Sequence, residues 1–341
     1  MSMEIRPRMG YIKAMKLSFI IPAYNEESYI GKSLESIQRE IKGGEYDVEI
    51  IVVNNASTDA TKKVALSFSG VRVIDETKKG LLHARQAGFL ASTGDFIIQL
   101  DADTIICAGW LKTALSEFAK NPKLVAASGP VIYYDLPPIS KKLTRLGYHV
   151  MFVSYLMNRF ILRVGSMLQG GLCIIRRSAL EQVGGYNSEI NFYGEDTDLA
   201  RRLQTIGPVK FTFKLPTYSS GRRVAIEGFW EMARRYYVNH IWITFMKRSY
   251  TNEYLDIRTT VDSNNPISLF QFKPELKLHR QFIVGIILII AFLGVVAGVQ
   301  ASHDAISDSK FVQTINNKVR VLSDKASRMY NYLDSDTLNI R

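Results

Sequence analysis

Short apolar runs alternate with helical stripes between residues 17 and 129, and this alternation constrains the fold more than any other feature. The apolar runs have the length of buried strands, and they span residues 17–21, 49–53, 71–74, 96–100 and 124–128. Two helices are expected after Asp59 and Gly80, and an earlier helical stripe consists of Ile30, Leu34, Ile37 and Ile41. Strands that alternate with helices form a parallel sheet covered on both faces. We therefore predict an α/β fold with a mostly parallel sheet flanked by helices.

Polar residues follow three of the predicted strands at the point where each strand ends. These residues are Asn25, Asn55 and Asp101. Because ligands bind at the carboxyl ends of parallel strands, we expect the three side chains to share one cleft. Asp101 and Asp103 flank Ala102, and their carboxylates suit a hard cation such as Mg²⁺ or Mn²⁺. The alternative interpretation is a turn in which the two aspartates cap the following helix.

The net charge of the chain indicates which classes of molecule it can bind. The 341 residues include 43 Lys and Arg against 32 Asp and Glu, so the net charge is +11. A basic surface can face nucleic acid, anionic lipid or phosphorylated substrates. The sequence has no nucleic-acid-binding module of the common types, and we therefore expect no nucleic-acid partner.

Residues 281–300 predict a single membrane span, because eighteen uncharged residues lie between Gln281 and Gln300. The alternative, a helix buried in a soluble core, is disfavoured because such helices rarely lack a polar face over this length. Acidic residues follow the span, whereas the residues before it are basic: Lys273, Lys277 and Arg280. The positive-inside rule therefore places residues 1–280 in the cytoplasm, on a protein anchored once in the inner membrane.

These patterns divide the chain into segments. They are a flexible basic N-terminus (1–15), an α/β domain (16–225), a juxtamembrane helical region (226–280), the transmembrane helix (281–300) and an extracytoplasmic amphipathic tail (301–341). Residues 139–163 and 228–248 mix aromatic and apolar residues with Arg and Lys, which is typical either of interfacial helices or of ordinary core helices. The tail has apolar residues at alternating spacings of four and three, which makes it a candidate for homo-oligomer formation.

Four motifs occur in order, at residues 18–27 (SFIIPAYNEE), 51–59 (IVVNNASTD), 101–103 (DAD) and 194–196 (GED). Together they resemble the family 2 glycosyltransferases of the GT-A fold, over about residues 16–225. The resemblance implies a Rossmann-like sheet and an inverting transferase that uses a nucleotide-diphosphate sugar and a divalent metal, Mg²⁺ or Mn²⁺. The Gln-x-x-Arg-Trp motif of the family's processive synthases is absent, which disfavours a polymer synthase.

The resemblance also implies roles for individual residues. The donor side comprises Pro22, Ala23, Tyr24, Glu26, Asn55, Lys79, Arg85, Asp101, Ala102, Arg222 and Arg223. The acceptor side comprises Gly170, Gly171 and Glu195. Asp101 and Asp103 are the implied metal ligands, with Asp103 the more direct one. Asn54 and Asn55 stand where the family often has two aspartates, and uridine is the favoured base. For Lys79, a solvated basic face is the competing interpretation.

Asp196 is the candidate general base. Inversion by direct displacement needs a carboxylate that removes the proton of the acceptor hydroxyl as it attacks, and the resemblance gives this role to the aspartate of the Glu195-Asp196 pair. These acids, with Asp198 as a further candidate, also suit the first turn of a helix through Leu199, where the helix dipole favours negative charge. The two interpretations are compatible.

We therefore expect a hexosyltransferase that moves a sugar from a nucleotide sugar, with a UDP-sugar favoured, to a hydroxyl of a lipid-linked saccharide or glycolipid at the cytoplasmic membrane face. Transfer to a polyprenyl phosphate is a second interpretation, which Asp196 disfavours because an anionic acceptor needs no base. A third is an inactive membrane-tethered scaffold of the same fold, in which the loss of Asp101, Asp103 or Asp196 would be expected.

Overall fold

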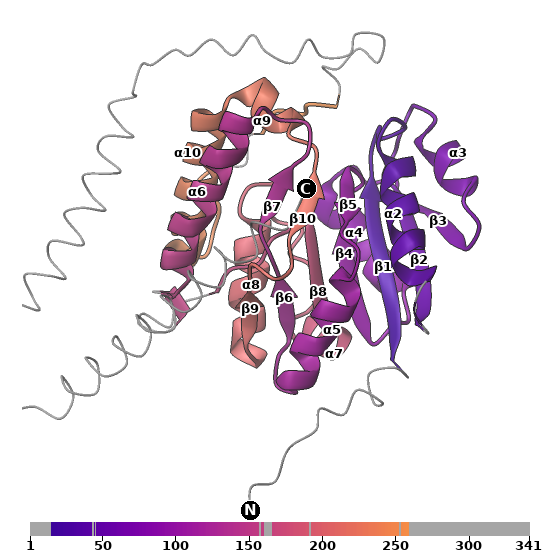
Figure 1. Ribbon diagram of the computed structural model, residues 1–341, viewed down its shortest axis with the longest axis horizontal. Coiled ribbons are helices and arrows are strands. Elements are labelled where there is room, and N and C mark those ends of the chain that lie inside the picture. The colour runs from indigo at the N-terminus through magenta and orange to yellow at the C-terminus, as the bar shows by residue number, and fades with distance from the viewer. Residues whose placement is uncertain are drawn as a thin grey trace, which may run out of the picture. The chain divides into compact units, whose positions relative to one another are not determined.

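A sheet in the order β3-β2-β1-β4-β8-β6-β9 organises the computed structural model (Figure 1), which describes residues 15–42, 44, 46–156, 158–159, 166–190, 192–251 and 254–258. The strands are β1 (Lys16–Ala23), β2 (Asp47–Asn54), β3 (Val71–Asp75), β4 (Phe96–Leu100), β6 (Ala126–Ser128), β8 (Leu172–Arg176) and β9 (Val209–Phe211). The first four are parallel, whereas β8 is antiparallel to both β4 and β6. The predicted, mostly parallel sheet is confirmed, and every predicted run overlaps a strand.

Helices cover both faces of this sheet. Successive side chains of β1 point to opposite faces, so their packing partners identify the helices on each face. Phe19 and Ile21 pack in one core cluster with residues of α2 and α5, while Ile20 packs in a second cluster with residues of α4, α7 and α8. All three side chains are fully buried. The covering helices are α2 (Ile30–Lys42), α3 (Thr61–Leu66), α4 (Leu81–Ala91), α5 (Trp110–Lys120), α7 (Arg177–Gln182) and α8 (Glu195–Ile206). The helices expected from the first stripe and after Asp59 and Gly80 are therefore present.

A small second sheet forms beside the carboxyl end of β4. Its order is β5-β10-β7, with strands β5 (Thr104–Ile106), β7 (Val131–Tyr133) and β10 (Thr217–Ser219). β5 begins directly after Asp103 and pairs antiparallel with β10, so that Thr104 lies opposite Ser219. This pairing brings the segment that follows β10 back to the predicted aspartates, more than a hundred residues away in the sequence.

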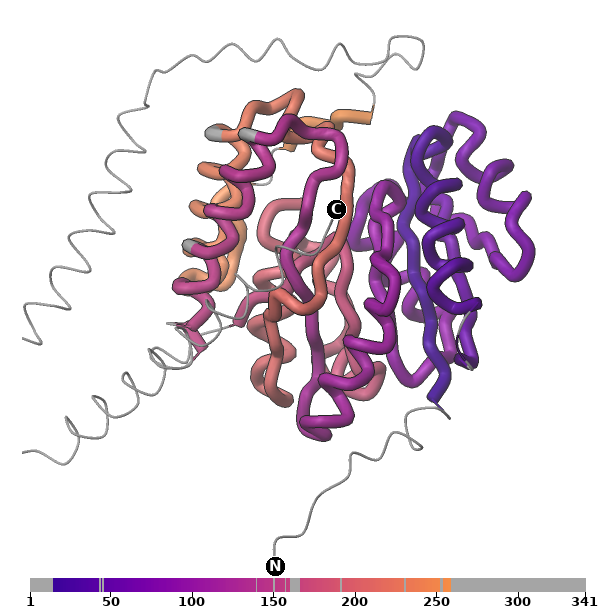
Figure 2. The backbone as a smooth tube through the Cα atoms, in the orientation of Figure 1, coloured from indigo at the N-terminus to yellow at the C-terminus, as the bar shows by residue number. Residues whose placement is uncertain are grey.

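The other α-helices of the described residues are α6 (Pro138–Leu156), which lies between β7 and β8, and α9 (Arg222–Glu227) and α10 (Phe229–Met246), which follow β10. The predicted domain boundary at residue 225 falls inside α9. Figure 2 traces the chain from the indigo strand β1 to the orange helix α10. No helix among the described residues is long and apolar enough to span a bilayer. The predicted span (281–300) and tail (301–341) lie outside the described residues, as do residues 1–14.

We predict that Gly88→Ala lowers the free energy of unfolding by about 1–3 kcal/mol, because overpacking a tight helix–sheet contact forces its neighbours to shift. A Cβ at Gly88 of α4 would lie 2.4 Å from the Ile20 side chain and 3.0 Å from that of Val53. The matched control is Gly147→Ala in α6, where no atom lies within 4 Å of the added Cβ. That change should raise stability by about 0.5–1 kcal/mol. Chemical denaturation of both variants checks the contrast, and equal destabilisation would contradict it.

Candidate active site

The buried guanidinium of Arg85 connects two acidic groups at the carboxyl end of β4. Arg85 belongs to α4 and its side chain is 1% exposed. One terminal nitrogen lies 3.0 Å from the carboxylate of Asp101, and the other lies 2.7 Å from that of Glu195. The first nitrogen also donates to the Gly170 carbonyl at 3.2 Å. Arg85 therefore brings three predicted site residues together around itself.

Gly170 and Gly171 let these acids lie against the backbone. A Cβ at Gly170 would lie 2.6 Å from Oε1 of Glu195, and a Cβ at Gly171 would lie 3.6 Å from Oδ2 of Asp101. The Asp101 N–H donates to the Gly171 carbonyl at 3.0 Å, which fixes the loop before β8 against the end of β4. The predicted acceptor-side glycines thus border the acidic cluster directly.

Asp196 stands in the first turn of α8, next to this cluster. The Thr197 N–H donates to its Oδ1 at 2.7 Å, and a hydrogen bond from the Gly170 backbone also stabilises the carboxylate. Burial nevertheless raises the pKa of Asp196 above its usual value. Burial also raises the pKa of Glu195 to about 7, against the opposing charge of Arg85 and with that of Asp196 adding to the rise. Asp198, by contrast, is 4% exposed and is held by Arg201 and Arg202 at 2.9 and 2.7 Å.

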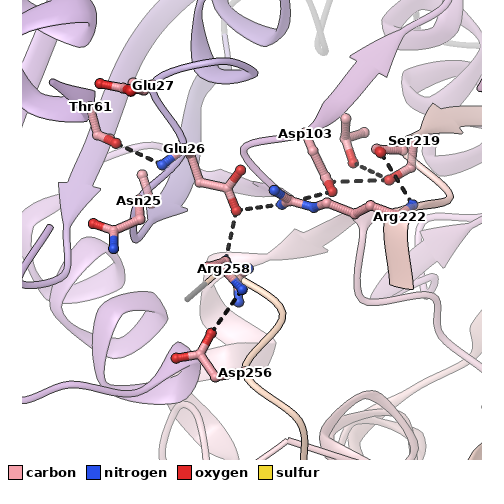
Figure 3. A network of polar contacts seen from close by, with 12 residues as sticks. Asn25, Glu26, Glu27, Thr61, Asp103, Ser219, Arg222, Asp256 and Arg258 are labelled. Carbon is pink, nitrogen blue, oxygen red and sulfur yellow. Dashed lines mark hydrogen bonds and ion pairs between the residues drawn. The ribbon is translucent and has the colours of Figure 1, made fainter. Parts of the chain in front are cut away.

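Asp103 belongs to a second cluster, which Figure 3 shows. Its Oδ2 lies 3.0 Å from Arg222, and its Oδ1 accepts a hydrogen bond from Ser219 at 3.2 Å. Arg222 also lies 2.5 Å from Oε1 of Glu26, which is 1% exposed and receives a second guanidinium, that of Arg258, at 2.8 Å. Two carboxylates and two arginines thus meet at this point.

Asp101 lies between the two clusters. Burial is the largest cause that raises its pKa, and the negative charges of Asp103 and Glu195 raise it further, while Arg85 lowers it. Asp103 and Glu195 therefore lie near enough to Asp101 to affect its pKa, and Asp196 follows Glu195 in the first turn of α8.

Some of the remaining donor-side residues contact other side chains near the site, and others hydrogen-bond to the backbone of a loop. Lys79 lies 3.9 Å from the ring centroid of Tyr24 and 3.0 Å from Asp256, which places the two predicted residues, Lys79 and Tyr24, next to each other. Asn55 is 3% exposed, and its amide bonds the backbone of residues 76, 78 and 80. Asn55 therefore fixes the loop before α4 with both the nitrogen and the oxygen of its side-chain amide.

The structure also locates the remaining predicted site residues, and it adds two residues that the motifs did not predict. Pro22 and Ala23 end β1, and Ala102 is buried between the two aspartates. Arg223 pairs with Glu227 at 2.5 Å rather than with an acid of either cluster. The sequence reading missed Arg258 and Ser219. The pairing of β5 with β10 explains Ser219, but no local pattern marks Arg258.

Comparison with known proteins assigns this arrangement to a family. Residues 18–184, which run from within β1 to just beyond α7 and include both aspartates, match the family described as glycosyl transferase family 2. These residues form a family 2 glycosyltransferase domain. The fold agrees with this assignment, since a mannosyltransferase from Pyrobaculum calidifontis, solved with GDP-Man and Mn²⁺, has a TM-score of 0.53 at 21% identity. That likeness covers 68% of this chain and 63% of the other, and it concerns the fold.

Curated relatives match the transferase domain in part. A poly-β-1,6-N-acetyl-D-glucosamine synthase of Staphylococcus epidermidis is 25% identical over 179 residues, which are 51% of this chain and 42% of that protein. A dolichyl-phosphate β-glucosyltransferase of Trichomonas vaginalis is 31% identical over 155 residues, which are 40% of this chain and 47% of that protein. The chain thus spans less than half the length of these relatives.

The carboxylates of the transferase domain suit a hard cation as part of a shared site. Within the described ranges, no group of three or more His, Cys, Asp or Glu side chains could hold a metal ion by itself. Mg²⁺ is typically bound by one or two carboxylates together with substrate phosphates. Asp103 and Asp101 therefore fit a cation whose other ligands come from a phosphorylated donor, and Arg222 pairs with Asp103.

We predict that stability falls as the pH rises from about 4.5 to about 7, because the folded chain holds the proton of Glu195 to a higher pH than the unfolded chain does. The contribution of this group is fully present below 4.5 and is lost as the pH passes the folded value. Glu195→Gln should flatten this part of the profile, measured by urea unfolding at several pH values. Glu181→Gln, at an exposed carboxylate of α7, is the control and should leave the slope unchanged. A Glu195→Gln profile identical to wild type would contradict the assignment.

Proposed function

We propose that the chain is an inverting glycosyltransferase that moves a sugar from a nucleotide-diphosphate sugar to a hydroxyl of a lipid-linked saccharide or glycolipid. A UDP-sugar is the favoured donor. The observation that carries the proposal is the position of Asp196, which adjoins the cluster of Arg85, Asp101 and Glu195 and receives a hydrogen bond from Gly170. A carboxylate at this point can take the proton of an acceptor hydroxyl next to the donor side.

The electrostatics of the two clusters support a diphosphate donor. Arg222 and Lys79 supply cationic groups beside Asp103 and Tyr24, and charge-assisted hydrogen bonds to phosphate are among the strongest that proteins form. A Mg²⁺ or Mn²⁺ ion held by Asp103 and Asp101 would act as a Lewis acid that stabilises charge on the leaving diphosphate. The Pyrobaculum calidifontis mannosyltransferase, which has a related fold, was solved with GDP-Man and Mn²⁺. Asp196 then needs only to orient the acceptor and remove one proton.

A membrane setting supports a lipid-linked acceptor. Phe245, Met246 and Tyr250, at and beyond the end of α10, are 51%, 57% and 55% exposed, beside the exposed cations Lys247 and Arg248. Apolar side chains flanked by Lys and Arg are typical of segments that lie at a bilayer surface. Together with the apolar stretch 281–300, they support a single-pass protein of the inner membrane whose domain faces the cytoplasm.

A second candidate function is transfer to a polyprenyl phosphate. Two relatives carry this activity in their names: the Trichomonas vaginalis dolichyl-phosphate β-glucosyltransferase, and a dolichol-phosphate mannosyltransferase of Pyrococcus furiosus that is 40% identical over 93 residues, 26% of each chain. A phosphate acceptor is already anionic, so that reaction would not need Asp196 as a base. The two functions therefore differ in their dependence on this one carboxylate.

We predict that Asp196→Asn lowers kcat for transfer to a hydroxyl acceptor about 10²–10⁴-fold, the range for loss of a general base, while nucleotide-sugar binding persists. Radiolabelled sugar transfer and donor titration measure the two effects. Turnover that is unchanged with a polyprenyl phosphate acceptor would favour the second function instead.

The neighbouring acid Asp198 supplies the control for this experiment. Its carboxylate is occupied by Arg201 and Arg202, so Asp198→Asn should lower the free energy of unfolding by roughly 1–3 kcal/mol and leave the turnover of the folded protein near that of wild type. If Asp198→Asn abolished turnover and Asp196→Asn did not, the base assignment would be wrong.

We predict that the full-length chain stays in the membrane pellet after carbonate extraction. Replacing Leu288 and Ile290 with Arg should release it, because each charge costs about 2.5–3.5 kcal/mol at the centre of a span. Replacing the same residues with Ala is the control and should retain the chain in the pellet. Release of the unaltered chain by carbonate would contradict the predicted span.

A further inference from the structure

A short segment after α10 contacts the donor side of the site, although it lies outside the matched transferase domain. We name residues 254–258 the C-terminal strap. Asp256 of the strap pairs with Lys79 at 3.0 Å, and the Nε of Arg258 donates to Glu26 at 2.8 Å. Figure 3 shows Arg258 beside Asp256 and directed at Glu26. The strap therefore reaches the residues predicted to bind the donor.

The strap also contacts Arg223 and Phe192, two residues that lie later in the chain than Lys79 and Glu26. The carbonyl of Leu255 accepts a hydrogen bond from Arg223 at 3.2 Å, and Tyr254 stacks on Phe192 with ring centroids 5.1 Å apart. Ile257 is 3% exposed, so its side chain is part of the packed structure. These contacts, together with those to Lys79 and Glu26, hold Arg258 in a defined position.

Two guanidinium groups converge there on a single carboxylate oxygen. Arg222 and Arg258 both bond to Oε1 of Glu26, at 2.5 and 2.8 Å, whereas Oε2 of Glu26 is buried and has no hydrogen-bond partner among the described residues. The side chain of Arg258 is 25% exposed and that of Arg222 is 7% exposed. A guanidinium carries five donors in a planar fork that matches phosphate, and the bond from Arg258 to Glu26 uses Nε.

We propose that Arg258 is a donor-binding residue, which together with Arg222 binds the diphosphate of the nucleotide sugar. The ion pair between Asp256 and Lys79 holds the strap so that Arg258 faces this diphosphate. The proposal rests on the proposed function, because it takes a nucleotide-diphosphate donor as the ligand. The proposal adds to the site the guanidinium of Arg258, which lies beyond α10 and 232 residues from Glu26 in the sequence.

The same contacts suggest an opposite role, in which the strap fills the donor site and competes with the nucleotide. The two roles predict effects of opposite sign. If Arg258 binds the diphosphate, its removal weakens nucleotide binding. If the strap blocks the site, removal of Arg258 or Asp256 opens the site and strengthens binding.

The test measures binding of UDP and of GDP, each with Mn²⁺, to the full-length chain by isothermal titration calorimetry. Arg258→Ala should weaken binding of the preferred nucleotide about 10-fold or more, because it loses charge-assisted hydrogen bonds to phosphate. Arg258→Lys should lose less, since it keeps the charge but not the planar fork. Asp256→Asn should weaken binding a few-fold. Arg234→Ala removes an arginine of α10 whose side chain is 44% exposed and pairs with Glu231, and it should bind as wild type does.

Further measurements separate the outcomes. Uridine lacks phosphate, so Arg258→Ala should bind it as well as wild type does. An equal loss for uridine and UDP would assign Arg258 to the base and overturn the diphosphate contact. Unchanged or tighter nucleotide binding by Arg258→Ala, at a wild-type melting temperature, would overturn the proposal alone. A wild-type chain that binds neither nucleotide would overturn the proposed function, and this inference with it.

Discussion

The guanidinium of Arg85 is the group on which the arrangement of the site depends. It comes from α4, whereas Asp101 follows β4 and Glu195 begins α8, so Arg85 joins elements that lie far apart in the sequence. A buried carboxylate without a partner would lose its proton only at great cost. Because Arg85 serves both Asp101 and Glu195, the two acids can lie close together beside Gly170 without either being left unpaired.

Charge balance links this cluster to the one around Asp103. Arg222 pairs with both Asp103 and Glu26 and neutralises each in part. On the proposed function, a cation that binds Asp103 takes over that neutralisation, and Arg222 becomes available to the phosphates that enter with the cation. Donor and metal would then bind together more readily than either would alone, because each supplies the partner that the other displaces.

A site residue could be predicted from the sequence when its signal is local, and could not when its partner lies far away in the sequence. The strands and Asp101 could be predicted because apolar runs are local, and because parallel strands present their carboxyl ends at one edge. The antiparallel direction of β8 could not be read from the sequence, since a five-residue apolar run looks the same in either direction. The resemblance implies that Asn55 contacts the nucleotide, and the structure adds that its side-chain amide bonds the backbone of the following loop, which no sequence pattern indicates. Arg258 has no motif, and its partner Glu26 lies near the other end of the domain.

The cost of this site is itself informative. Removing charged groups from water costs several kcal/mol for each ion, so buried ion pairs contribute little to stability compared with apolar side chains of similar size. Arg85, Arg222 and Glu26 are each at least nine-tenths buried, in a domain whose two cores of Ile, Leu, Val and Phe already hold the sheet together. Folding alone would be served better by apolar residues at these positions. The charges are therefore best explained by a ligand that is itself charged, and a diphosphate accompanied by a divalent cation carries both of the signs that these side chains present.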